Sequence, residues 1–144
     1  MKNYHPIFLI LLLFLTSCAV EPQPINYGKD ACHFCKMNIV DSQHAAQFVT
    51  EKGKCYKFDA IECMLNQIKD FDEAPISLHL ICDYSIPGEL TDATKATYLI
   101  SDAIPSPMGG FLTGFSSQEK AVATQAKAGG MLLSWEQLNL KYGL

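Results

Sequence analysis

Apolar side chains recur with two different periods in the first half of the chain. Residues 45–51 and 54–58 each carry strand-forming side chains, and the turn residue Gly53 between them predicts a β-hairpin. Apolar positions at helical spacing then predict a helix over residues 60–71, with Asp59 placed to cap its first backbone amides. The apolar face of this helix comprises Ile61, Met64, Leu65 and Ile68.

A strand over residues 76–84 completes a ββαβ unit, and the second half repeats that order. It contains two strand-like runs, a helix capped by Ser116 or Ser117, a third strand, and a short closing helix that Ser134 and Gln137 can open as a capping box. The first four of these segments are residues 96–101, 111–115, 116–127 and 131–133. Two similar ββαβ units predict an α+β fold, in which helices cover one face of the sheets of a small domain.

The front of the chain follows neither period. Lys2 supplies a positive charge, and residues 7–15 are continuously apolar. This run is too short for a bilayer span of about 20 residues but fits the apolar part of a signal peptide. The motif Leu-Thr-Ser-Cys ending at Cys18 resembles the lipobox of bacterial lipoproteins, in which the cysteine thiol receives a diacylglycerol. We predict a signal peptide over residues 1–17 and lipidation at Cys18; an ordinary secreted protein or a short anchor helix is the alternative.

The rest of the chain is expected to form a tether and one domain. Residues 18–28 contain two prolines and little periodicity, which is typical of a linker. Residues 29–144 have the length of one domain, with halves at about 29–84 and 85–144. The net charge is −4 and the chain contains no Arg. A mildly acidic chain without Arg does not suit a nucleic-acid partner, because phosphate contacts rely on clustered Lys and Arg.

An odd number of cysteines follows Cys18, so disulfides cannot pair all of them. They are Cys32, Cys35, Cys55, Cys63 and Cys82. Oxidising compartments modify idle thiols, so at least one of these must be buried or used. Cys55 and Cys82 lie in predicted strands, which favours core or disulfide roles. Cys63 lies in the predicted helix, a position that leaves both a structural and a functional role open.

Soft metal ligands are concentrated between residues 32 and 37. The candidates there are Cys32, His33, Cys35 and Met37. Thiolates and thioethers favour Cu(I) over hard ions, and His33 is the weaker partner beside two thiols. The sequence therefore predicts a Cu(I) site built on this short segment.

Met108 is a second candidate thioether. It follows a proline and precedes two glycines, residues that shape a sharp turn and can present the thioether on a loop. Met64 and Met131 stand in apolar runs instead, and we expect both in the core, where methionine usually serves as a filler.

The Cys32-x-x-Cys35 spacing also allows other uses. A thiol–disulfide redox pair should follow a strand and open a helix, and this pair does neither. A zinc site needs further ligands, which Cys55, Cys63 or Cys82 could contribute. A disulfide that staples the end of the tether is the third possibility. No nucleophile–base arrangement or phosphate-binding loop is present in the sequence, so no enzyme is predicted.

Several short motifs, in order, resemble the NosL family of lipoproteins that serve nitrous oxide reductase. The central motif is Cys35-Lys36-Met37, which looks like the Cys-x-Met signature of that family. The other landmarks are the lipobox ending at Cys18, the stretch Lys54–Asp59, the strand around Tyr98, the loop Pro107–Gly110 and the pair Gly114-Phe115. The resemblance covers nearly the whole chain after Cys18.

The resemblance implies a periplasmic Cu(I) chaperone with two ββαβ units. It implies Cys35, Met37 and Met108 as metal ligands, with Cys32 as an extra ligand, a disulfide partner of Cys35 or a redox guard. It also implies delivery of copper to the maturation machinery of nitrous oxide reductase, which includes a periplasmic partner and an ABC-type membrane complex. Ala19 is not the Asp that signals inner-membrane retention, which favours the outer membrane for the lipid anchor. A lipid-anchored redox protein that uses Cys32 and Cys35 is the competing hypothesis.

Overall fold

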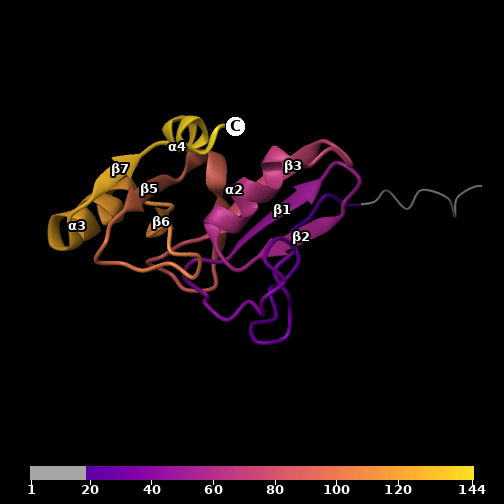
Figure 1. Cartoon of the computed structure of the whole chain (residues 1–144), viewed down its shortest axis with the longest axis horizontal. Coiled ribbons are helices and arrows are strands. Elements are labelled where there is room, and N and C mark those ends of the chain that lie inside the picture. The colour runs from indigo at the N-terminus through magenta and orange to yellow at the C-terminus, as the bar shows by residue number, and fades with distance from the viewer. Residues whose placement is uncertain (1–18) are drawn as a thin grey trace, which may run out of the picture.

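A computed structural model describes residues 19–144. The predicted signal peptide and the lipidation of Cys18 lie outside the described residues. Figure 1 shows two sheets lying next to each other, with α4 above the junction between them and α3 at the far end of the second sheet. Within residues 19–144, no helix is long and apolar enough to cross a bilayer.

The first antiparallel sheet has the order β2-β1-β3-β4, and its last strand lies a few residues beyond the expected boundary near residue 84. Its strands are β1 (Ala46–Thr50), β2 (Cys55–Phe58), β3 (Ile76–Cys82) and β4 (Leu90–Asp92). Every residue of the central strand β1 is buried. The helix α2 (Ile61–Lys69) packs on β1 and β2, with five consecutive residues buried at its start. This half therefore supplies most of the core.

The second half forms a smaller antiparallel sheet in the order β6-β5-β7. Its elements are η2 (Ala93–Lys95), β5 (Thr97–Ile100), β6 (Leu112–Phe115), α3 (Gln118–Ala128), β7 (Met131–Leu133) and α4 (Trp135–Tyr142). The helix α3 packs on this sheet, while α4 contacts β5, β7 and α2. The two halves meet closely at Gly114, where a Cβ atom would lie 2.1 Å from Cδ1 of Ile81.

The structure confirms the α+β prediction and both ββαβ orders. Ser117 caps α3, and Ser134 with Gln137 forms the predicted capping box of α4. The prediction that Asp59 caps α2 was wrong. Ala60 occupies the N-cap position without a side-chain cap, and the Asp59 carboxylate instead accepts a hydrogen bond from the Val40 amide at 3.4 Å.

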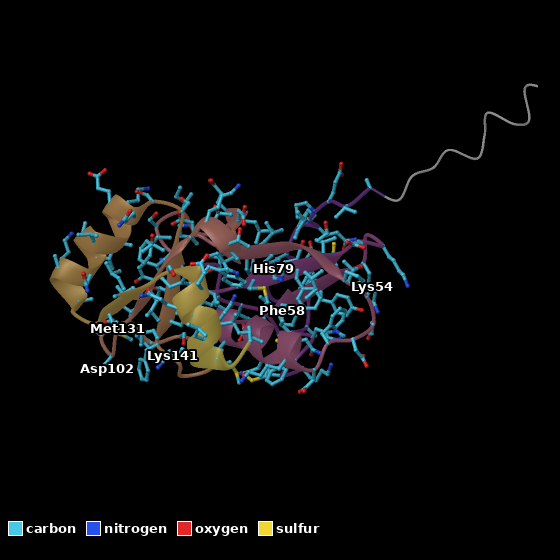
Figure 2. All side chains as sticks on the ribbon, turned by 90° about the horizontal axis from the view of Figure 1, so that it is seen from above. Lys54, Phe58, His79, Asp102, Met131 and Lys141 are labelled. Atoms are coloured by element: carbon cyan, nitrogen blue, oxygen red, sulfur yellow. The ribbon has the colours of Figure 1, made fainter. Side chains whose placement is uncertain are left out.

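Met131 does not lie in the core. Its side chain is 49% exposed, whereas Met64 is fully buried as predicted. Met131 is on β7, which pairs only with β5 in this sheet. Figure 2 shows it at the end of the molecule away from Lys54. An apolar run of three residues on an edge strand does not reveal which side chain faces solvent.

The segment predicted as a tether contacts the domain along part of its length. The side chain of the fully buried Gln47 makes two hydrogen bonds with the backbone of Gln23, of 2.9 and 2.8 Å. Ile25 and Tyr27 pack against the core. The described part of this segment is therefore fixed on the first sheet from Gln23 onward.

Candidate metal centre

Backbone hydrogen bonds close the segment 32–37 into a compact turn. The Cys32 amide donates to the Met37 carbonyl at 2.7 Å, and the Lys36 amide donates to the Cys32 carbonyl at 3.0 Å. The flanking residues Ala31 and Asn38 form an isolated antiparallel bridge. Lys36 has a φ of 66°, in the left-handed region that non-glycine residues seldom adopt. The turn thus holds both cysteines and Met37 at the expense of backbone strain.

This turn is docked on strand β2. The His33 amide donates to the Lys57 carbonyl at 2.8 Å, and the Lys57 ammonium forms a half-buried ion pair with Asp30 at 2.6 Å. The hydrogen bond from Lys57 lowers the pKa of Asp30. The His33 ring packs edge-on against Tyr56, with ring centroids 4.6 Å apart. His33 is therefore used in packing and is not part of the thiol group described next.

Three thiols converge beneath the turn. The sulfur atoms of Cys32, Cys35 and Cys63 all lie within 4.8 Å of one another, and we call these three residues the thiol cluster. Cys32 and Cys63 are fully buried, and Cys35 is partly exposed. Cys63 is the third residue of α2, so the cluster joins the turn to the beginning of that helix. All three are free thiols.

Hydrogen bonds give the three thiols unequal acidity. The pKa of Cys32 is lowered, chiefly because the Cys63 thiol donates to its sulfur, and backbone amides of Asp59 and Cys35 also point to it. Donating that proton to Cys32, together with burial, raises the pKa of Cys63. Burial raises the pKa of Cys35. Cys32 is thus the thiol of the cluster that ionises first.

The two predicted thioethers are on the surface. Met37 is 59% exposed and Met108 is 41% exposed, and we call these two residues the thioether pair. Met37 follows Cys35 by two positions, so one thioether is next to the cluster along the chain. The role of the thioether pair as ligands remains a prediction.

A buried carboxylate holds the loop that carries Met108. Glu62 is 4% exposed and accepts hydrogen bonds from the Ser106 hydroxyl and from the Gly110 amide, the latter at 3.1 Å. A Cβ atom at position 110 would lie 2.5 Å from Oε1 of Glu62, so a larger residue there would collide with this carboxylate. Because Glu62 adjoins Cys63, the Met108 loop is fixed to the same helical turn that supplies the third thiol.

The structure brings together two of the four predicted ligands, Cys32 and Cys35, and adds Cys63, whose role the sequence left open. The other two thiols after Cys18 are outside the cluster. The Cys55 thiol donates to the Glu21 carbonyl at 3.4 Å, and the Cys82 sulfur lies 3.3 Å from the Tyr27 hydroxyl. Glu62 was missed altogether, since nothing in its local sequence distinguishes it from a solvated glutamate.

Comparison with known proteins places this chain in a family. The NosL family model matches residues 24–142, which is most of the chain. The chain belongs to the NosL family. A curated family member, the copper-binding lipoprotein NosL of Stutzerimonas stutzeri, is 28% identical over 149 residues, covering 90% of this chain and 77% of that protein.

A solved NosL structure has the same fold. The crystal structure of the copper chaperone NosL from Shewanella denitrificans matches with a TM-score of 0.71 at 19% identity, covering 83% of this chain and 96% of that one. Both relatives are named for copper binding or delivery and not for catalysis, which agrees with the prediction of a non-enzymatic NosL protein.

Proposed function

We propose that this NosL protein is an extracytoplasmic Cu(I) metallochaperone that delivers copper for the maturation of nitrous oxide reductase. The observation that carries the proposal is the convergence of three free thiols beneath a turn that also presents Met37. Thiolates and thioethers are the ligands that select Cu(I). The names of the two relatives support copper as the cargo.

Each predicted ligand has a distinct part in this proposal. Cys35 supplies a thiolate and the thioether pair supplies two weaker donors, with Cys32 as a further thiolate. The exposure of Met37 and Met108 lets a partner's ligands replace them one at a time. Transfer by ligand exchange needs no change in the oxidation state of the ion.

The proposed setting is the periplasmic face of a bacterial membrane, with Cys18 as the lipid anchor and the outer membrane favoured. Several acyl chains on one cysteine anchor firmly, because each buried CH₂ contributes about 0.8 kcal/mol. The proposed recipients are a periplasmic partner and an ABC-type membrane complex of the nitrous oxide reductase maturation machinery. No nucleic acid is involved.

A lipid-anchored thiol–disulfide protein is the second candidate. Its support is the lowered pKa of Cys32 beside the free thiol of Cys35, since a thiolate is the form that attacks a disulfide. This function would not need Met37 or Met108. Loss of both thioethers therefore separates the two candidates in cells.

The first test is a Cu(I) titration of the full-length product, purified in detergent under anaerobic, reducing conditions, against a chromophoric Cu(I) chelator. We expect one tightly held Cu(I) in the wild type and a loss of at least about tenfold in affinity for Cys35→Ser. Cys55→Ser is the matched control, since its thiol is outside the cluster. Absence of Cu(I) binding in the wild type would contradict the chaperone.

Delivery is tested in a denitrifying bacterium whose own NosL gene is deleted. Expression of this chain should restore the copper content of nitrous oxide reductase, and the Cys35→Ser variant should not. The double variant Met37→Ala/Met108→Ala should also fail to restore it, because ligand exchange needs the exposed thioethers. Restoration by that double variant, together with failure of Cys32→Ser, would favour the redox candidate.

A further inference from the structure

We propose that Cys63 completes a buried three-thiolate site in which the ion rests, and that Cys35 is shared between this site and the exposed thioether pair. The ion would then have two alternative positions: an inner one bound by Cys32, Cys35 and Cys63, and an outer one bound by Cys35, Met37 and Met108. This inference rests on the proposed function and adds to it a third thiolate and a resting position away from solvent.

The sulfur geometry suits a three-coordinate soft metal ion. Metal–thiolate bonds are about 2.3 Å long, which places the three sulfurs of a planar trigonal site about 4 Å apart. The three sulfurs of the cluster already lie within 4.8 Å of one another without an ion. Small side-chain rotations are enough to close the cluster around a metal.

The surroundings of the cluster favour negative charge on sulfur. Cys63 is in the first turn of α2, where the helix dipole favours anions, and no side chain caps that end of the helix. Backbone amides of Asp59 and Cys35 point to the Cys32 sulfur. These amides are held by the fold, so they are in place before the ion arrives.

Burial distinguishes the inner position from the outer one. Cys32 and Cys63 are fully buried, so a partner's ligands cannot reach an ion held between them. Cys35 is partly exposed and is therefore the residue that can stay bound while the ion changes position. Loading the inner position releases to solvent the protons that the three sulfurs still carry. When the ion moves outward, the vacated sulfurs take up the same protons again and the ion remains Cu(I).

The test compares Cu(I) affinities of the full-length protein and its variants by chelator competition under anaerobic, reducing conditions. Cys63→Ser should weaken binding by at least about tenfold, which corresponds to 1.4 kcal/mol. The double variant Met37→Ala/Met108→Ala should lose no more than about twofold, because the inner position still holds the ion. The variant that carries all three substitutions should bind Cu(I) much more weakly than Cys63→Ser or the double thioether variant. Both the inner and the outer position lack ligands in that variant.

Cys82→Ser is the matched control for Cys63→Ser. Cys82 is also a fully buried free cysteine, but its sulfur lies beside Tyr27 and outside the cluster. We expect Cys82→Ser to keep the wild-type affinity even if it lowers thermal stability. Cys63→Ala, measured beside Cys63→Ser, shows whether loss of the ligand or introduction of a buried hydroxyl is responsible.

The outcomes separate this inference from the proposed function. If Cys35→Ser weakens Cu(I) binding while Cys63→Ser leaves it unchanged, the chaperone stands and the inner position is wrong. A loss of at least about tenfold in the double thioether variant would overturn the inner position as well, because the ion would then depend on the outer ligands. If the wild type binds no Cu(I), both ideas fail.

Discussion

The two halves of this NosL protein share the ββαβ order but bury their helices very differently. Five residues at the start of α2 are buried, whereas Ala121 is the only buried residue of α3. All cysteines after Cys18 lie in the first half, and the second half contributes the Met108 loop. The half with the buried helix keeps Cys32 and Cys63 away from solvent, while the half with the exposed helix presents the thioether of Met108 at the surface.

A matched pair of methionine substitutions tests this contrast and has the largest expected effect on stability. Met64→Ala should lower the free energy of unfolding by about 2–5 kcal/mol, because it opens a cavity beneath the first sheet. Met131→Ala should change it by no more than about 0.5 kcal/mol, because Met131 is half exposed. Urea unfolding of both variants measures the difference. Equal losses would mean that the two halves are packed alike.

The next largest effect on stability is expected at Glu62, whose carboxylate links the two halves through its hydrogen bonds with Ser106 and Gly110. Glu62→Ala should lower the free energy of unfolding by about 1–3 kcal/mol, because it leaves the buried Ser106 hydroxyl and the Gly110 amide without their acceptor. Gly110→Ala should lower the free energy of unfolding by about 1–3 kcal/mol, because its Cβ collides with Oε1 of Glu62.

A double-mutant cycle sharpens this prediction. The combined variant Glu62→Ala/Gly110→Ala should lose less stability than the two single losses together, since removal of the carboxylate also removes the collision. Simple additivity would show that the carboxylate does not hold the loop.

A smaller effect is expected from the strained turn in the first half. Lys36→Gly should raise the free energy of unfolding by about 1 kcal/mol, because glycine adopts the left-handed conformation without the Cβ penalty. Lys36→Ala keeps the Cβ atom and should bring no such gain. Thermal unfolding of the wild type, Lys36→Gly and Lys36→Ala at one pH measures the difference. Equal stability of the Gly and Ala variants would show that the backbone at position 36 is not strained.

The smallest effect is the pH dependence of the ion pair that docks this turn. The pKa of Asp30 is lower in the folded protein, so near pH 4 the unfolded chain binds more protons and stability rises with pH. The contribution, about 0.2–1 kcal/mol for a pair of this kind, is complete above the unfolded pKa and is lost as pH falls through the folded pKa. Asp30→Asn should lack this acid-dependent part when urea unfolding is compared between pH 3 and 6. Parallel pH curves for both proteins would contradict the prediction.

Sequence periodicity predicted the elements that have long, clear patterns. The face formed by Ile61, Met64 and Leu65 was sufficient to place α2. The three-residue strand β4 was missed because so short a segment has no period of its own. Its pairing with β3 is what defines it as a strand. The prediction of an Asp59 cap was wrong for a similar reason. The Asp59 carboxylate accepts a hydrogen bond from the amide of Val40, which is distant in the sequence.

The site was partly predictable for the same physical reasons. Cys32, Cys35 and Met37 are adjacent in sequence, so their chemistry could be recognised directly. Cys63 reaches them only through the docking of the turn on β2 and the packing of α2 beneath it. Glu62 acquires its role from a hydrogen bond to Gly110 across 48 positions of the chain. Long-range contacts of this kind leave no local signal.

The anchoring of Gln23 on the first sheet limits how far a lipidated domain can travel. Gln23 comes five positions after Cys18, a span of at most about 18 Å when fully extended. With the proposed lipid on Cys18, so short a segment would keep the domain close to the lipid head groups and leave it to find neighbours by lateral diffusion. A proposed recipient of copper would then have to meet it near the bilayer surface.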